Sequence, residues 1–145
     1  MSRGLLDTNI VLRLLDRTAS EHQVCVNAIE ALLIRGDEPC LAPQVLIEFW
    51  VVATRPVNVN GFGWTATQVI DAISHLRSLF LLLDDTPAIF EAWLALVSSG
   101  VSGKRAHDAK LAAFMQVHGI SEILTLNGAD FKDFPVTAVH PDSVV

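Results

Sequence analysis

Short apolar runs alternate with longer stretches of helical periodicity along the chain. The run at 4–6 stops at Asp7, and apolar residues then recur at helical spacing as far as Leu15. Further short runs predict strands at 39–42, 80–83, 122–126 and 137–139. Amphipathic or apolar stretches predict helices over 20–36, 44–54, 65–79, 85–97 and 107–117. Strands that alternate with helices indicate an α/β fold.

The order of these elements predicts a short, mostly parallel central sheet with helices on both faces, a three-layer α/β/α sandwich. Polar stretches that contain glycine predict loops at 55–63 and 98–105, and a turn follows at 127–134. The length of 145 residues is that of one ordinary domain. We therefore expect residues 1–145 to form a single domain.

Composition narrows the class of protein. Hydrophobic residues make up 51% of the chain, which argues against disorder, and two cysteines cannot frame a disulfide scaffold. We expect both cysteines to be reduced core residues. No apolar run approaches the roughly 18–20 residues that a membrane span needs, and a carboxylate at position 7 argues against a signal peptide. A cytoplasmic protein without membrane contact is the expectation.

The net charge of −6 argues against a protein that coats nucleic acid, because such proteins show a basic surface. It still allows an enzyme that contacts nucleic acid through a small basic patch.

Acidic residues follow several predicted strands, at the edge where parallel α/β sheets bind their ligands. They are Asp7, the pair Asp84–Asp85, and Asp130 within the turn at 127–134. Asp7 could also be a simple helix cap, and Asp84–Asp85 is best explained as a strand end and helix start.

Two further carboxylates lie on predicted helices. Glu48 is surrounded by apolar residues, so its helix is expected to be buried, and the residue either pairs with a base such as Arg55 or takes part in a site. Asp108 shares a helix face with core residues, although it could simply complement the helix dipole. Several carboxylates in one cleft repel each other unless a divalent cation lies between them. Oxygen ligands without cysteine or histidine favour Mg²⁺ or Mn²⁺.

Four segments resemble the PIN-domain (PilT N-terminus) ribonucleases, including the VapC-type toxins of toxin–antitoxin modules. The segments are Leu5-Leu6-Asp7-Thr8-Asn9, Ile47-Glu48-Phe49, His107-Asp108-Ala109-Lys110-Leu111-Ala112-Ala113, and Ile123-Leu124-Thr125-Leu126-Asn127-Gly128-Ala129-Asp130-Phe131. The resemblance covers nearly the whole chain. It implies a PIN-like α/β/α domain that binds one or two Mg²⁺ ions and hydrolyses RNA phosphodiester bonds.

The resemblance also implies roles for individual residues. Asp7, Glu48 and Asp108 match the family's first three acidic positions and would bind the metal. The fourth position falls on Asn127, which carries less charge, and nearby Asp130 could substitute for it. Thr8, Asn9 and Thr125 match the polar residues that support these acids.

RNA binding by an acidic chain requires local bases. Lys104, Arg105 and Lys110 surround Asp108, and further bases at the expected rim are Arg13, Arg55 and Lys132. The family often dimerises and is inhibited by a small antitoxin protein. An apolar helical face at 24–34 or 69–79 could bind the second subunit.

Two other functions compete with a toxin ribonuclease. Asn127 favours a catalytically weak or inactive PIN scaffold that binds RNA or protein. A structure-specific DNA nuclease of related fold is the third, although 145 residues leave little room for its added DNA-binding segments.

Overall fold

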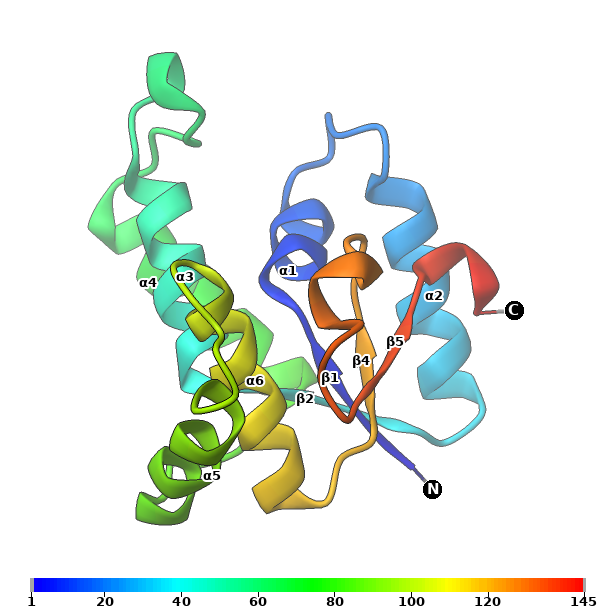
Figure 1. Cartoon of the computed structure of the whole chain (residues 1–145). Coiled ribbons are helices and arrows are strands. Elements are labelled where there is room, and N and C mark those ends of the chain that lie inside the picture. Colours follow the sequence, from blue (N-terminus) through cyan, green and yellow to red (C-terminus); the bar gives the residue numbers. More distant parts are fainter. Residues whose placement is uncertain (1, 145) are drawn as a thin grey trace.

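The computed structural model describes residues 2–144, and its centre is a five-stranded sheet in the order β3-β2-β1-β4-β5. All neighbouring strands pair in parallel, so the expected mostly parallel sheet is parallel throughout. The strands are β1 (Arg3–Leu6), β2 (Glu38–Leu41), β3 (Leu81–Leu82), β4 (Glu122–Leu124) and β5 (Thr137–Val139). Each is short, which keeps the carboxyl ends of the strands close to the helices that follow them (Figure 1).

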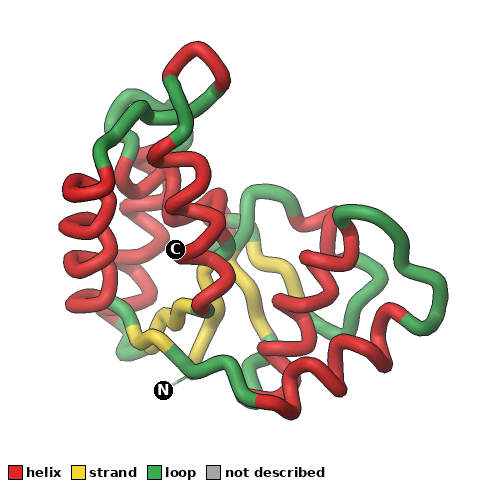
Figure 2. Tube along the Cα trace, turned by 90° about the vertical axis from the view of Figure 1, so that its left-hand side faces the viewer, coloured by secondary structure: helices red, strands yellow, loops and turns green. Residues whose placement is uncertain are grey.

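Six α-helices connect the strands within the described residues. They are α1 (Thr8–Leu15), α2 (His22–Ile34), α3 (Pro43–Thr54), α4 (Ala66–Leu79), α5 (Pro87–Val97) and α6 (Arg105–His118). Three short 3₁₀ turns complete the chain, at η1 (Val57–Val59), η2 (Gly128–Phe131) and η3 (Pro141–Ser143). Figure 2 shows the strands between two groups of helices, which confirms the predicted three-layer α/β/α arrangement.

The core lies between the sheet and these helices. Fully buried side chains come from β1, from α3 and above all from α6, where the run Leu111–Met115 is sealed from solvent. Cys25 and Cys40 are free and buried, as expected. Among the described residues, no helix is long and apolar enough to span a membrane.

Element boundaries differ from the sequence prediction mainly at strand ends. The strand expected over 80–83 pairs only at Leu81–Leu82, and the strand expected over 122–126 ends at Leu124. The helix expected at 107 begins at Arg105. The end of β4 matters for the site. The Thr125 amide still donates to the Val139 carbonyl of β5 at 3.0 Å, and the Thr125 side chain and the backbone of residues 126–127 make the contacts described below.

The prediction that the helix of Glu48 is buried all round is wrong. α3 buries Val45, Phe49 and Ala53 on one face, whereas Ile47 is 65% and Val51 53% exposed. An apolar composition alone could not distinguish a buried helix from one that presents an apolar face to solvent.

Candidate active site

The pairing of β1 with β4 sets the centre of the site. Leu6 and Leu124 are partners in this parallel pair, so the next residues along each strand, Asp7 and Thr125, leave the sheet side by side. The Asp7 amide still donates to the Leu124 carbonyl over 3.0 Å. Both side chains therefore lie at the carboxyl edge of the sheet, and both are buried.

Both carboxylate oxygens of Asp7 accept hydrogen bonds. Oδ1 accepts from the Thr8 amide at 2.7 Å and caps α1, and Oδ2 accepts from the Thr125 hydroxyl at 2.8 Å and from the Asn9 amide group at 3.3 Å. Burial raises the pKa of Asp7 above its ordinary 3.8, although these donors oppose the shift. The role of Asp7 as a helix cap therefore accounts for the contact of Oδ1 only, and not for the two hydrogen bonds that Oδ2 accepts.

Asn9 and Thr125 also fix the backbone that follows β4. Asn9 Oδ1 accepts from the Leu126 amide at 3.0 Å, and the Thr125 hydroxyl oxygen accepts from the Asn127 amide at 3.0 Å. The segment after β4 is thus joined to the start of α1 by side chains. The predicted supporting residues Asn9 and Thr125 do meet at Asp7.

Glu48 is held by Thr8 and by a residue that the sequence analysis did not select. Its Oε1 accepts from the Thr8 hydroxyl at 2.6 Å, and its Oε2 accepts from the Gln44 amide nitrogen at 3.2 Å. The alternative of a pair with Arg55 is wrong, because Arg55 donates to the Asn60 carbonyl in the loop after α3. Arg55 therefore supports that loop, and its role at an RNA-binding rim is not supported.

Asp108 lies in the first turn of α6, on the face that carries buried Leu111, Ala112 and Met115. Its pKa is raised to about 6, first by burial and then by the nearby charges of Asp130, Asp7 and Glu48. The same repulsion from Glu48 and Asp130 acts on Asp7. The structure thus brings all four carboxylates into one electrostatic neighbourhood.

The turn after β4 contributes two exposed groups. Asn127 precedes η2 and Asp130 lies within it, where the Asp130 amide donates to the Asn127 carbonyl. Asp130 is therefore the acid that acts on Asp7 and Asp108 from this side. Across residues 2–144, however, no three acidic, histidine or cysteine side chains are already arranged as a metal coordination sphere.

The predicted substrate-binding bases are largely engaged with acids. Arg105 pairs with Asp133 at 2.8 Å and lies 5.5 Å above the ring of Phe134, and Lys110 approaches Asp85 at 3.4 Å. Asp84 and Asp85 lie between the end of β3 and the start of α5, as expected, although the residue that caps α5 is Thr86. Lys104, the third base expected around Asp108, is exposed. Of the bases expected at the rim, Arg13 pairs with Glu21 and Lys132 is exposed.

In a comparison with known protein families, the PIN domain model matches residues 4–136. The chain belongs to the PIN domain family. The match includes all of β1 except Arg3, and all four carboxylates of the site. The domain is 29% identical over 140 residues to Ribonuclease VapC24 of Mycobacterium tuberculosis, across 92% of each chain.

Solved structures share the fold of this PIN domain at low identity. VapBC2 from Rickettsia felis, bound to a DNA fragment from its promoter, superposes with a TM-score of 0.70 at 16% identity, over 95% of this chain and 98% of that one. A toxin–antitoxin complex from Klebsiella pneumoniae gives 0.67 at 22% identity, over 95% and 97%. These similarities confirm the PIN architecture.

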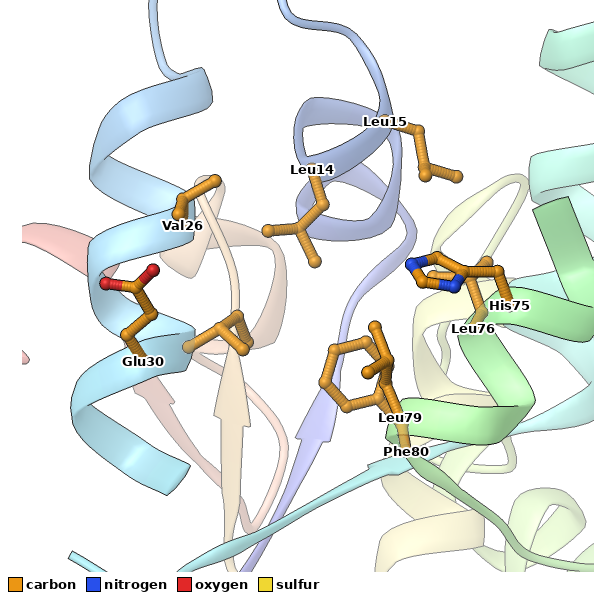
Figure 3. A pocket seen from close by; sticks show the side chains of 9 residues that line it. Leu14, Leu15, Val26, Glu30, His75, Leu76, Leu79 and Phe80 are labelled. Atoms are coloured by element: carbon orange, nitrogen blue, oxygen red, sulfur yellow. The ribbon is translucent and has the colours of Figure 1, made fainter. Parts of the chain in front are cut away.

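A separate apolar groove lies between α1, α2 and α4 of the PIN domain, with a volume of about 170 Å³. Leu14 and Leu15 line it from α1, Leu79 lines it from α4, and Glu30 and His75 are its polar members (Figure 3). None of the four carboxylates of the site lines this groove.

Proposed function

We propose that this PIN domain is a divalent-metal-dependent endoribonuclease that acts as the toxin of a toxin–antitoxin pair. The observation that carries the proposal is a set of four neighbouring carboxylates, which come from the residue after β1, from α3, from α6 and from η2. Burial first, and the charges of the neighbouring acids second, raise the pKa of Asp7 and Asp108. Its relative of 29% identity is named a ribonuclease.

The donor set fits Mg²⁺ or Mn²⁺. It consists of carboxylate oxygens, and the buried Gln44 Oε1 has no hydrogen-bond partner, so an acceptor beside Glu48 is left unused. Asp7, Glu48 and Asp108 would hold the ion, and Asp130 would approach from η2. A bound ion would supply an activated water and would neutralise charge on the leaving oxygen.

The protein's own residues orient the carboxylates. Thr125 and Asn9 fix Oδ2 of Asp7, and Thr8 joins the start of α1 to Glu48 on α3. Three donors on Asp7 offset part of the cost of its burial. The acids are thereby kept close in spite of their repulsion, which is the pre-organisation that a cation site requires.

An RNA cleavage assay tests the proposal. The purified chain should cut single-stranded RNA internally with Mg²⁺ or Mn²⁺ and should stop when a chelator removes the ion. Cleavage that continues in excess chelator would contradict the metal dependence.

The second candidate is a PIN scaffold that binds without cutting. It is favoured by the neutral Asn127 at the fourth position and by the absence, among residues 2–144, of three side chains already arranged around a cation. An RNA-binding chain that shows neither Mn²⁺ binding nor cleavage would support the scaffold.

For RNA binding we propose the start of α6, at the carboxyl edge of the sheet. The double variant Lys104→Ala/Arg105→Ala should weaken affinity for single-stranded RNA about 10-fold and reduce the slope of log K against log salt by about 1.4, because two phosphate contacts are lost. Filter binding at several salt concentrations measures both.

A matched control removes the same charge elsewhere. Arg35 and Arg77 lie near the carboxyl ends of α2 and α4, which lead into β2 and β3 at the opposite edge of the sheet. The variant Arg35→Ala/Arg77→Ala should keep the slope of the wild-type protein. Equal losses in both double variants would indicate a general charge effect and would remove Lys104 and Arg105 from the binding surface.

We also propose that a second copy of the chain covers the exposed face of α3 and α4. Ile47, Trp50 and Val51 of α3, with Ile73 of α4, line an apolar hollow of about 320 Å³. Ile70, three residues before Ile73 on α4, is also exposed. Part of the apolar stretch expected at 69–79 therefore belongs to this surface.

The variant Ile47→Arg should convert a dimer into a monomer, measured by light scattering. Ile34→Arg is the control, because Ile34 is 86% exposed at the end of α2 and lies outside the hollow. A dimer that survives Ile47→Arg would place the interface elsewhere.

An antitoxin partner is proposed by similarity to the Klebsiella complex. The groove of Figure 3 offers that partner an apolar binding surface.

A further inference from the structure

Gln44 is a buried polar residue whose contacts bridge two parts of the site. It is 9% exposed, and Asp7 and Thr125 are the other buried polar or charged residues of the described chain. It lies in the first turn of α3, four residues before Glu48, so both side chains are on the same helix face.

One amide nitrogen of Gln44 joins α3 to α6. Nε2 donates to Glu48 Oε2 at 3.2 Å and to the His107 carbonyl at 3.0 Å, and His107 directly precedes Asp108. Both partners are pure acceptors in this arrangement, so the amide nitrogen must face them and the amide cannot be flipped. Gln44 thus connects the carboxylate of Glu48 with the backbone that carries Asp108.

The oxygen of the same amide has no partner. Oε1 is buried and accepts no hydrogen bond. Buried acceptors are normally satisfied by protein or by ordered water. Oε1 is thus an unused acceptor beside Glu48, and both hydrogen bonds of the amide nitrogen run to parts of the candidate site.

We infer that Gln44 is a positioning residue that sets the separation of Glu48 and Asp108 for a divalent cation. This inference rests on the proposed function. Gln44 acts through its two hydrogen bonds, and its effect on the cation therefore passes through Glu48 and the first turn of α6.

Mn²⁺ affinity, measured by calorimetry, is the first test. The variant Gln44→Met keeps a side chain of similar length but removes both donors. It should weaken Mn²⁺ binding about 10- to 100-fold, the usual cost of losing a residue that orients a metal ligand. Unchanged affinity would overturn the inference.

The chain offers a matched control in Gln23. It occupies the second position of α2 and donates to Asn27 four residues later at 2.8 Å, on the surface. Gln23→Met therefore removes the same kind of hydrogen bond from the same place in a helix. It should leave Mn²⁺ affinity unchanged, and a loss equal to that of Gln44→Met would overturn the inference.

A double-mutant cycle separates positioning from a general structural role. In a Glu48→Gln background, Gln44→Met should cost several-fold less in Mn²⁺ affinity than in the wild-type protein, because one of the two groups that Gln44 positions, the Glu48 carboxylate, is already gone and only the contact to the His107 carbonyl remains. The full 10- to 100-fold loss in that background would overturn the inference. If Gln44→Met does not fold, Gln44→Leu decides, because it also removes the donors without adding a charge beside Glu48, and unchanged Mn²⁺ affinity in that variant would overturn the inference.

Failure of the inference differs from failure of the proposed function. A wild-type chain that binds no Mn²⁺ and cuts no RNA contradicts the proposed function itself. A wild-type chain that binds and cuts, together with a Gln44→Met variant of equal Mn²⁺ affinity, contradicts only the role of Gln44.

Discussion

Asp7→Asn and Asp108→Asn should each reduce Mg²⁺-dependent RNA cleavage by about 10²–10³-fold or more, while the fold is retained. Each substitution keeps the size of the side chain but removes a charge that would hold the cation. Asp7 contributes a carboxylate held by three donors, and Asp108 one whose pKa is raised to about 6 by burial and by the other three acids. Single-turnover cleavage of a labelled RNA measures the loss.

Asp85→Asn is the matched control for these variants. Asp85 follows β3 at the same edge of the sheet, but it is exposed and its partner is Lys110. It should retain cleavage within a few-fold of the wild-type protein. Circular dichroism must show equal helix content in all variants. Substantial Mg²⁺-dependent cleavage by folded Asp7→Asn or Asp108→Asn would refute the assignment of these carboxylates.

Without a divalent cation, Asp7 and Asp108 should make the protein less stable as the pH rises. Their pKa values are higher in the folded state than the ordinary 3.8, so the folded state binds protons more tightly. Their contribution to the free energy of unfolding is therefore fully present below about pH 4. It is lost as the pH rises through about 6, the pKa of Asp108.

The variant Asp108→Asn isolates this contribution. Asp16, Glu21 and Asp37 have lowered pKa values and act in the opposite direction, so the difference between variant and wild type is the quantity to measure. In chelator at pH 7, Asp108→Asn should be more stable by about 1–2 kcal/mol, after allowance for solvent screening of a partly exposed group. Denaturant unfolding at pH 4 and pH 7 measures it.

Saturating Mn²⁺ should reverse that order. An ion at about 100 times its dissociation constant stabilises the folded wild-type protein by about 2.7 kcal/mol, and the variant should gain far less. If the stability difference between wild type and variant is the same at pH 4 and pH 7, the pKa of Asp108 is not raised by its surroundings. If the wild-type protein gains no stability from Mn²⁺, the four carboxylates do not form a cation site.

The fold was largely predictable because strands and helices alternate with distinct periods. The helix expected from position 65 begins as α4, with a capping box between Thr65 and Gln68. The burial of α3 was not predictable, because Ile47 and Val51 are as apolar as the core residues of the same helix. Which apolar face meets the sheet is decided by the tertiary structure.

Most residues of the candidate site could be predicted from the sequence, because they follow predicted strands or lie on the core-facing side of predicted helices. The charges of Glu48 and Asp130 raise the pKa of both Asp7 and Asp108, although a cation among the four acids remains a proposal. Gln44 was missed, since a glutamine in the first turn of a helix is ordinarily a surface residue. A signal was present in its spacing of four residues from Glu48. The acidic partners of Arg105 and Lys110 could not be foreseen, because Asp133 and Asp85 are distant in sequence.

The adjacency of Asp7 and Thr125 has a consequence for how such proteins can vary in length. The two residues are 118 positions apart in sequence, yet the register of β1 against β4 alone places them together. Chain added or removed within the connecting loops leaves that register intact. The loop that carries η1 and extends beyond the helices in Figure 1 is therefore a segment where insertions, tags or new recognition elements can be tolerated. A single residue inserted within β1 or β4 would instead turn successive side chains to the opposite face and separate the pair.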